Sequence, residues 1–414
     1  MARWLLPEGI SDVLPSEAPF LERLRRSALD LYRGYGYELV VPPLLEYTDS
    51  LLTGVGADLD LRTLKLVDQV SGRLLGLRAD TTPQVARIDA HILNRAGVVR
   101  LCYAASVLHA RPLHPLATRE PFYVGAELFG HASVLADAEV LELAVRSLGL
   151  ARIAELRFDL GHTRILRALL ELDPAARQMS EEIVAALSTK DAAALGPLTE
   201  ALAAPARTAL RALMRLHGDR QVLAAARAEL PAMPQVLAAL DELDRLTEVL
   251  GRLDAAISID LADLHGFRYH TGATFAAYAA GWPVALARGG RYDDIGRAFG
   301  RARPATGFSI DLRELARLHQ GTTARAILAP AGADGTVAVL VERLRAAGEI
   351  VIQRLGDDDR IDGMECDREI RRAVERAGLR VEEFVYLNRV RNGVLRGVAR
   401  GLRSNGFILL CRAA

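Results

Sequence analysis

The chain has 414 residues, enough for two or three domains, and its 50% hydrophobic and 25% charged composition is ordinary for a globular protein. Lys and Arg together number 52, as do Asp and Glu, so the net charge is zero. This balance argues against a protein whose main work is holding nucleic acid, although a local basic face is compatible with a neutral total.

The cysteine pattern and the lengths of the apolar runs indicate the cellular compartment of the protein. Cys102, Cys366 and Cys411 are far apart and form no C-x-x-C pair, so neither a zinc site nor a disulfide framework is supported. The first 20 residues do not read as a secretory signal, and no apolar run approaches the roughly 18 residues of a membrane span. We expect a cytoplasmic protein with no metal and no membrane contact.

The first 160 residues predict helices alternating with antiparallel hairpins. An amphipathic helix is expected at 16–34, opened by a Ser16 cap. The pattern then predicts a strand broken by Pro42 and Pro43, a hairpin in "RTLKLVDQVSGRLLGLRAD" with a Ser71-Gly72 turn, a helix at 81–96, strands in "VVRLCYAASVLHA" and "EPFYVGAELFG" joined by the loop 111–118, a helix at about 135–149 and a strand in "IAELRFDLG".

The second half predicts a helical insertion and a small terminal module. Residues from about 165 to 255 are rich in Ala, Leu and Arg at helical spacing. Strands return at "GATFAAYAAG" and "PVALARGGRYDDIG", a helix is expected near Ser309, and a linker at 320–323 precedes a strand, a helix and a strand. We expect an α+β core over 1–318 and a small α/β module over 324–414, because hairpins outnumber strand–helix–strand crossovers in the core.

The segment "LRADTTPQVAR" places Arg78, Asp80, Thr81 and Thr82 at a predicted strand-to-helix junction. One interpretation is structural, with Asp80 or Thr81 capping the helix. The other is functional, with a carboxylate and a hydroxyl facing a cleft to receive an ammonium group.

The segment "YVGAELFG" places Glu127 among apolar and small residues of a predicted strand. A carboxylate on the covered face must be paired or must meet a ligand cation. The alternative is an outward-facing surface glutamate. The alternation of apolar and polar residues does not decide which face of the sheet Glu127 occupies.

The segment "ARGGRYDDIGRAFGRARPATGFSIDLREL" combines Gly289 and Gly290 with a basic set of side chains, Arg288, Arg291, Arg297, Arg301 and Arg303. This composition suits a phosphate cradle, but neither a P-loop nor a Rossmann fingerprint is present. The pair His109 and His114 is poorly spaced for a metal site, and no nucleophile triad emerges.

Five segments, "YGYELVVPPLLE", "LRADTTPQVAR", "REPFYVGAELFG", "RYHTGATF" and "GGRYDDIGRAFGRARPATGF", resemble in order and spacing the motifs of the class II histidyl-tRNA synthetase core. The resemblance covers roughly residues 5–318. It implies an antiparallel sheet of six to seven strands flanked by helices, and a homodimer interface at the first motif around Pro43.

The resemblance also shows where the synthetase's catalytic groups are replaced. Leu108 and Ala110 stand for the Arg and Glu of the second motif, Glu314 for the terminal Arg of the third, and His265 for the Arg of the signature motif. Asp311 stands where that family has Gly. Arg holds phosphate by two charge-assisted hydrogen bonds that these side chains cannot form. Each loss costs on the order of 2–4 kcal/mol of transition-state stabilisation, so we expect no adenylation and no catalytic residues.

The amino-acid pocket implied by the resemblance is largely kept. Asp80, Thr82, Glu127 and Tyr269 match its acidic, Thr, Glu and first Tyr positions, whereas Tyr123, His265 and His270 depart from it. We therefore expect histidine binding at Asp80, Thr82, Tyr123, Glu127, His265, Tyr269 and His270.

A synthetase-like core without its ATP-binding groups resembles the ATP phosphoribosyltransferase regulatory subunit family, whose pattern "CYAASVLHARP" and "REPFYVGAELFGHA" match. The resemblance implies a non-catalytic subunit without a cofactor. It further implies hetero-oligomer formation with a short-form catalytic subunit, and feedback inhibition by histidine as effector.

Two alternatives remain open at this point, a divergent histidyl-tRNA synthetase and a synthetase-like RNA-binding module. The segment after Ile370 is rich in arginine and matches no pattern. It suits a nucleic-acid-binding tail. We favour a solvated helical face or an altered reading frame, and we do not expect nucleic acid as a partner.

Overall fold

The structure is a computed structural model that describes residues 4–53, 57–113, 117–153, 155–253, 255–264, 266–318, 325–329, 335–353, 355, 365–366, 379–390, 393–396 and 407–413. The chain divides into two compact units, residues 1–320 and residues 321–414. No helix in the described ranges is long and apolar enough to cross a membrane.

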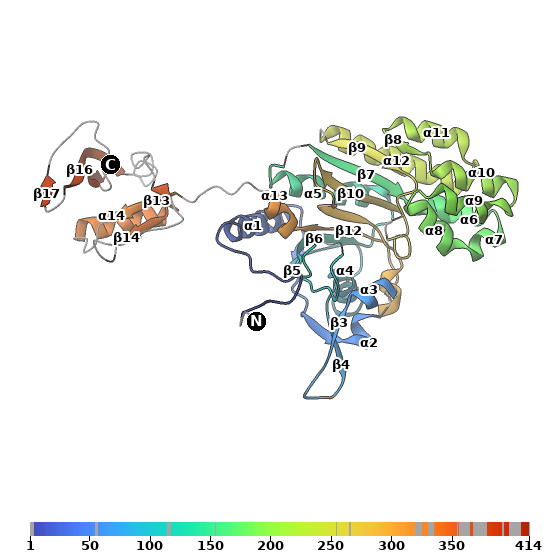
Figure 1. Ribbon diagram of the computed structural model, residues 1–414, viewed down its shortest axis with the longest axis horizontal. Helices are drawn as coiled ribbons and strands as arrows, with labels where there is room; N and C mark the ends of the chain where they lie inside the picture. The colour runs from blue at the N-terminus through green and yellow to red at the C-terminus, as the bar shows by residue number, and fades with distance from the viewer. Residues whose placement is uncertain are drawn as a thin grey trace. The chain divides into compact units, whose positions relative to one another are not determined.

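A nine-stranded, mostly antiparallel sheet organises the first unit (Figure 1). Its order is β1-β5-β6-β12-β11-β10-β7-β9-β8, and only the pairs β1–β5 and β7–β9 are parallel. The bounds are Glu38–Leu39 (β1), Val99–Ser106 (β5), Phe122–Phe129 (β6), Leu156–His162 (β7), His217–Gly218 (β8), Ala256–Asp260 (β9), Ala273–Ala279 (β10), Ala287–Arg291 (β11) and Ala305–Asp311 (β12). The expected α+β class is confirmed.

The sheet is larger than the six to seven strands that we expected. The short strands β8 and β9 were not predicted. β8 has only two residues within helical sequence, and β9 alternates over Ile257–Asp260 but directly follows the Ala- and Leu-rich segment that was assigned to helix. β1 contributes only two residues at the opposite edge.

Alternation along the strands separates a core face from an open face. In β6, Val124, Ala126 and Leu128 join the main hydrophobic core, and the intervening Tyr123 and Glu127 point to the other face. The core face is covered by three long helices, α1 (Ala18–Gly34), α5 (Val134–Gly149) and α12 (Pro234–Arg252), and α13 (Leu312–Leu318) packs beside α1.

Two helix starts differ from prediction. Helix α1 has Glu17 as its N-cap with no side-chain hydrogen bond, so the Ser16 cap is wrong. The helix expected near Ser309 begins instead at Leu312, because Phe308 and Ile310 still alternate into the core as part of β12.

A smaller sheet, β2-β4-β3, forms the hairpin arm at the bottom of Figure 1. The strands are Leu45–Tyr47 (β2), Leu64–Val67 (β3) and Leu74–Leu77 (β4), and the hairpin predicted around Ser71-Gly72 is confirmed. Gly72 has a φ of +72°, which the turn requires. Helical segments adjoin the arm at Thr48–Leu51 (α2), Ala57–Arg62 (α3), Thr82–Arg87 (α4) and the π-helical turn Ile88–Leu93 (η1).

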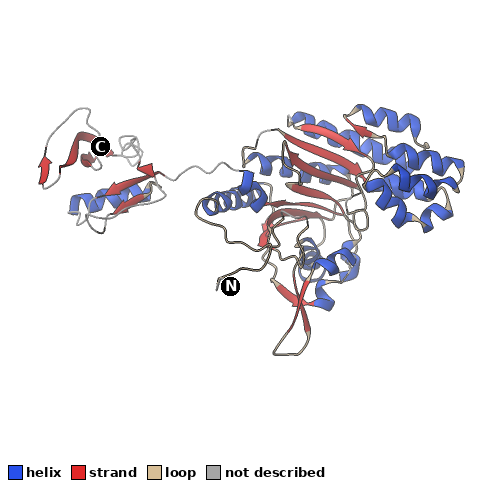
Figure 2. Cartoon of the chain, in the orientation of Figure 1, coloured by secondary structure: helices blue, strands red, loops and turns tan. Residues whose placement is uncertain are grey.

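The helical insertion lies beside the β7, β9 and β8 end of the sheet (Figure 2). Before α12 it contains Thr163–Leu170 (α6), Pro174–Gln178 (α7), Ser180–Ser188 (α8), Ala192–Glu200 (α9), Ala204–Leu213 (α10) and Gln221–Glu229 (α11). A short 3₁₀ turn, Ile295–Phe299 (η2), follows β11.

The second unit begins as a strand, a helix and a strand, as the sequence predicts. Its elements are Arg325–Ala329 (β13), Gly335–Ala346 (α14), Val351–Gln353 (β14), Glu365–Cys366 (β15), Leu379–Val390 (β16), Gly393–Arg396 (β17) and Phe407–Ala413 (β18). β13 pairs in parallel with both β14 and β15. The helical face expected after Ile370 is wrong, because β16 to β18 form an antiparallel sheet there, whereas the linker 320–323 lies outside the described residues.

Candidate functional site

The candidate site is the open face of the sheet where β6 and β12 pair. Glu127 stands opposite Gly307, and Tyr123 stands opposite Asp311. A Cβ on Gly307 would overlap Glu127 Oε2, so the glutamate side chain lies directly over this glycine. The glycine therefore makes room for a carboxylate on the sheet.

Glu127 is buried on this face and is held by hydroxyl groups. It is 1% exposed, which excludes the surface interpretation. Thr82 Oγ1 donates to Glu127 Oε1 at 2.9 Å, Tyr103 OH donates to the same oxygen at 3.4 Å, and Tyr292 OH donates to Oε2. Burial raises the pKa of Glu127 to about 8, against the hydrogen bonds from Tyr292 and Thr82, which lower it.

Asp80 and Thr82 reach Glu127 from the start of α4. Asp80 Oδ1 accepts a hydrogen bond from the Thr82 amide at 3.0 Å, so its carboxylate binds the first amide of α4, although the N-cap position itself is Thr81. The Thr81 side chain does not cap the helix, and its buried hydroxyl has no partner among the described residues. The charge of Asp80 also raises the pKa of Glu127, although less than burial does. The two carboxyl groups therefore lie close enough to interact.

Tyr269 and His270 enter the site from the loop between β9 and β10. Their rings lie 4.1 Å apart between centroids, and the Tyr269 ring lies 6.4 Å from that of Tyr292. His270 is buried over Gly290, where a Cβ would lie 3.0 Å from the imidazole ring. Tyr269 is 45% exposed, yet burial of its hydroxyl end and the charges of Asp80 and Glu127 raise its pKa.

The helical insertion fixes this loop. Arg167 on α6 donates to the carbonyl oxygens of Phe267 at 2.5 Å and His270 at 3.2 Å, and its guanidinium lies over the Phe267 ring. Thr163 Oγ1 donates to the His270 carbonyl at 3.2 Å. The backbone that carries Tyr269 and His270 is thus tied to the first helix of the insertion.

Of the other predicted site residues, the structure describes Tyr123 but not His265. Tyr123 lies on the same face of β6 as Glu127, and burial and the charge of Asp311 raise its pKa. Burial and the charge of Glu314 raise the pKa of Asp311 to about 7. His265, like His114, lies outside the described residues. Among the described residues no group of three His, Cys, Asp or Glu side chains is placed to hold a metal ion.

Glu314, which stands for the terminal Arg of the third motif, is paired within the fold. It is 5% exposed, accepts a hydrogen bond from Trp282 Nε1 at 3.2 Å and pairs with Arg317 at 3.1 Å. The carboxylate is thus occupied within the fold. Leu108 and Ala110 run beside the site, with their amides donating to the carbonyls of Arg78 and Arg62.

Arg78 connects the site to the two prolines of the first motif. It is 6% exposed and donates to the carbonyls of Pro42 at 2.7 Å and Ser106 at 2.8 Å. Gln84 Nε2 donates to the Pro43 carbonyl at 2.8 Å. The Pro42-Pro43 segment is therefore anchored on both sides of the Asp80–Thr82 turn.

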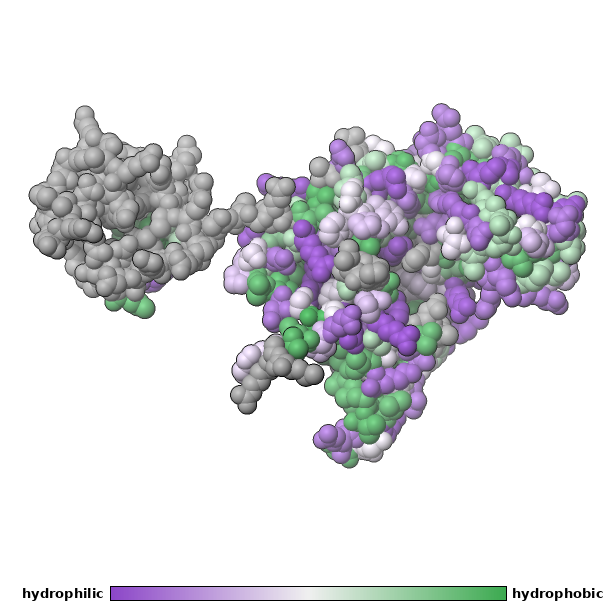
Figure 3. Space-filling view, in the orientation of Figure 1, coloured by the Kyte–Doolittle hydropathy of each residue, from purple (hydrophilic) through white to green (hydrophobic). Residues whose placement is uncertain are grey.

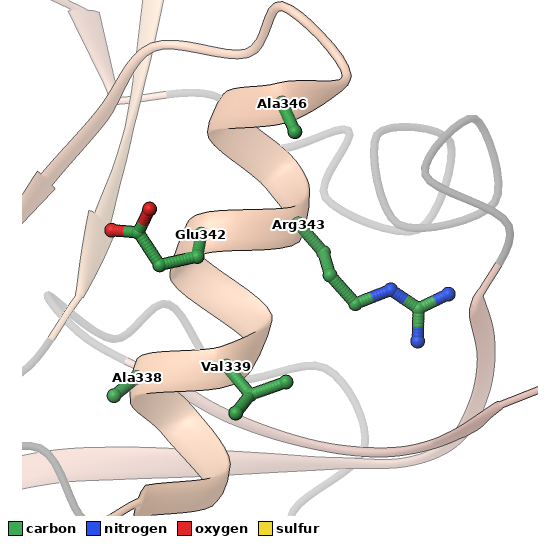
Figure 4. Close-up of a pocket in the computed structure, with 5 residues that line it drawn as sticks. All are labelled: Ala338, Val339, Glu342, Arg343 and Ala346. Atoms are coloured by element: carbon green, nitrogen blue, oxygen red, sulfur yellow. The ribbon is translucent and has the colours of Figure 1, made fainter.

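The hollow shown in Figure 4 belongs to the second unit and offers little for ligand binding. Its described lining residues all come from one exposed face of α14, namely Ala338, Val339, Glu342, Arg343 and Ala346. One carboxylate and one guanidinium among small apolar side chains do not form a set of convergent polar groups.

Sequence reasoning did not assign four residues to this site, although it considered one of them, Arg288, as part of a phosphate cradle. Tyr103 and Tyr292 hold Glu127, and Arg62 and Arg288 carry charges that act on Tyr123 and Tyr269. Tyr103 has the alternation that would place it beside Glu127 once the β5–β6 register is known, but the register is a tertiary property.

Comparison with known proteins shows which families this chain resembles. The histidyl-tRNA synthetase family model matches residues 9–315, and the model described as the ATP phosphoribosyltransferase subunit HisZ C-terminal domain matches residues 324–376. The ATP phosphoribosyltransferase regulatory subunit of Cupriavidus metallidurans is 57% identical over 372 residues, which are 89% of this chain and 97% of the relative. That of Burkholderia cenocepacia strain J2315 is 56% identical over 388 residues, which are 92% of this chain and 100% of the relative.

The chain belongs to the ATP phosphoribosyltransferase regulatory subunit family. A crystal structure titled as an ATP phosphoribosyltransferase regulatory subunit/histidyl-tRNA synthetase, from Bacillus halodurans, is 29% identical. Its TM-score is 0.76, and the match covers 86% of this chain and 94% of that one. Like the rest of its family, the chain is a non-catalytic relative of histidyl-tRNA synthetase with a place in histidine biosynthesis. The family assignment decides against the divergent synthetase.

Proposed function

We propose that this regulatory subunit binds histidine on the open face of the sheet and passes the occupancy of that site to a short-form ATP phosphoribosyltransferase catalytic subunit. The observation that carries the proposal is the environment of Glu127. A buried carboxyl group that meets only hydroxyl donors among the described residues is poorly compensated as an anion. An ammonium group brought by a ligand supplies the missing positive charge.

The surrounding residues suit an amino acid with an aromatic ring. Asp80 adds a second carboxyl group near Glu127, and the closely spaced, mutually tilted rings of Tyr269 and His270 offer a surface against which an imidazole can pack. Thr82 bridges the two carboxyl groups through its amide and its hydroxyl. Tyr123 and His265 complete the proposed set, the latter on the strength of the resemblance alone.

The proposed output is feedback inhibition. Histidine that binds one conformation more tightly than another shifts the population toward that conformation, and linkage requires that the catalytic subunit's ligands change histidine affinity by the same factor. We include a cytoplasmic location in the proposal, since ATP, from which the family's catalytic partner takes its name, is a cytoplasmic metabolite.

Titration calorimetry tests the ligand, with histidine and ATP run in parallel on the full chain. We expect saturable histidine binding and no ATP binding. ATP binding accompanied by adenylate formation would contradict the proposal. Histidine that gives no heat in the presence or absence of the catalytic subunit would remove the effector role.

Reconstitution tests the partner. The chain and a short-form catalytic subunit are expected to co-elute on size exclusion, with catalytic activity that depends on the chain and falls as histidine is added. A Glu127→Ala variant is expected to co-elute and support activity while losing inhibition by histidine. Catalytic activity that is indifferent to the chain would overturn the regulatory coupling.

We also propose that the chain forms a homodimer around Pro43. Seven exposed apolar side chains flank this residue or lie on the hairpin arm, and Figure 3 shows hydrophobic side chains gathered over β3 and β4. They are Leu39, Val41, Leu44, Leu45, Leu66, Val67 and Leu74, called the apolar arm surface below. An exposed apolar area of this kind marks an interface, and a two-fold axis pairs it with its own copy.

A further inference from the structure

Arg288 stands on the same open face as Glu127, two strands away. It lies opposite Ser309 on β12, and Ser309 lies opposite Gly125 on β6. Directly opposed residues in antiparallel strands share a face of the sheet. Tyr123 and Glu127 flank Gly125 on that face, so the guanidinium shares the face on which the proposed ligand is held.

The space beside Arg288 is not filled by bulky neighbours from the sheet. Its cross-strand neighbours, Ser309 and Ala276, are small. The next row toward the loop carries Gly290 and Gly307, over which His270 and Glu127 lie. Arg288 is thus the long cationic side chain in a row that runs from β6 to β10, and the other residues of this row are small.

Arg288 has no carboxylate partner within 4 Å among the described residues. Its guanidinium makes a single long contact, Nη2 to Tyr278 OH at 3.5 Å. The side chain is only partly exposed, so the usual solvated state of a surface arginine does not apply to it. Its charge opposes the rise in the pKa of Tyr123 and Tyr269 that burial and the neighbouring carboxylates cause, which places it near both phenols.

Arg62 is a second guanidinium that acts on Tyr123. It ends α3, its Nη2 lies 2.9 Å from His109 Nε2, and its buried Nε has no partner among the described residues. Burial and the charge of Arg62 lower the pKa of His109 to about 4, so the imidazole is neutral and does not balance the guanidinium. Arg62 and Arg288 therefore have no carboxylate partner among the described residues. Their charges act on Tyr123 and Tyr269, as the charge of Asp80 does.

We propose that Arg288, assisted by Arg62, binds the carboxylate of the amino acid whose ammonium group lies at Asp80 and Glu127. The inference rests on the proposed histidine site and extends it to the anionic half of the zwitterion. Arg presents a planar pair of donors that matches a carboxylate. The site then has opposite charges on its two sides, which selects an α-amino acid over an amine of the same shape.

Calorimetry with two ligands tests the assignment on the full chain. Histidine and histamine share the ammonium and imidazole groups and differ in the carboxylate. We expect the unmodified chain to bind histidine roughly 10- to 100-fold more tightly than histamine, the ratio that a charge-assisted hydrogen-bond pair supports. In Arg288→Met the histidine affinity is expected to fall to that of histamine, and the histamine affinity is expected to stay within about twofold of the parent value.

Two further variants separate binding from structure. Arg288→Lys keeps the charge but not the paired donors, so part of the preference for histidine is expected to return. Arg297→Met removes an exposed arginine of η2 that pairs with Asp294, and it is expected to change neither affinity. Melting curves report whether each variant is folded.

The outcomes are distinguishable. Histidine binding that is unchanged in Arg288→Met, or an equal loss for both ligands, would overturn the role of Arg288 and leave the histidine site standing. Equal affinity of the parent chain for histidine and histamine would overturn carboxylate recognition altogether. Absence of histidine binding to the parent chain would remove the proposed effector site and this inference with it.

Discussion

Thr82 and Glu127 are joined by a 2.9 Å hydrogen bond from the threonine hydroxyl to Oε1, although they lie 45 residues apart in the chain. One comes from the first turn of α4 and the other from the middle of β6. The bond ties the turn that carries Asp80 to the sheet. Glu127 has no cation partner among the described residues, so burial outweighs this bond and raises the pKa of the carboxyl group.

Histidine binding is expected to release a proton from Glu127. With a pKa of about 8, the buried carboxyl group is mostly protonated at pH 7, and an approaching ammonium group favours the ionised form. Affinity is therefore expected to rise with pH between 7 and 8, by up to about tenfold per unit. Calorimetry in buffers of different ionisation enthalpy measures the released proton directly. Identical heats in all buffers would contradict the prediction, and Glu120→Gln, outside the site, is expected to behave as the parent.

Glu127→Gln is expected to remove a pH-dependent destabilisation. The pKa of Glu127 is raised in the folded chain, so its contribution to stability is complete below the unfolded value of about 4.5 and is lost as the pH rises to 8. Glutamine fills the same space and does not titrate. The free energy of unfolding of the variant, relative to the parent, is expected to improve by about 2–3 kcal/mol from pH 6 to pH 8. Urea unfolding at the two pH values measures it, with the exposed Glu181→Gln as control. A difference that does not depend on pH would show that Glu127 is ionised throughout.

Arg167→Met is expected to weaken histidine binding without touching the ligand. The change removes the hydrogen bonds to the carbonyls of Phe267 and His270, so the loop that carries Tyr269 loses its tie to the insertion. A loss of about 3- to 10-fold in affinity corresponds to one or two ordinary hydrogen bonds. Arg177→Met, an exposed arginine of α7, serves as the control. Parent-like affinity in Arg167→Met, measured by calorimetry, would mean that the loop is held by other contacts.

Val41→Glu is expected to separate the proposed homodimer into monomers. Val41 is 80% exposed in the apolar arm surface, and a charge placed there is buried on dimerisation without a partner. Sedimentation velocity measures the change in mass. Leu135→Glu, 70% exposed at the start of α5, supplies a matched apolar-to-charge control that should leave the mass unchanged. A parent chain that sediments as a monomer at micromolar concentration would rule out this interface.

The site combines what sequence reasoning can find with what it cannot. Asp80, Thr82 and Glu127 were identified from motif resemblance, and the structure brings them together within hydrogen-bonding reach. Glu314 had the right motif position but the wrong surroundings, because Trp282 and Arg317 take up its carboxylate. A motif gives the position of a side chain along the chain, whereas its neighbours come from elements far away in sequence.

The α+β class, the helical insertion and the strands and helices of the core other than β8 and β9 follow from the sequence by itself, because alternation and helical spacing are local patterns. The sequence also indicates the absence of the synthetase's phosphate-binding arginines, since a missing side chain needs no fold to be recognised. The face of β6 that Glu127 occupies was decided only by the tertiary structure, through the packing of Val124 and Leu128 into the core. The tertiary structure alone also brings Tyr292 and Arg288 to that face. β11 lies two strands from β6 in the sheet, and this strand order is not a local pattern of the sequence.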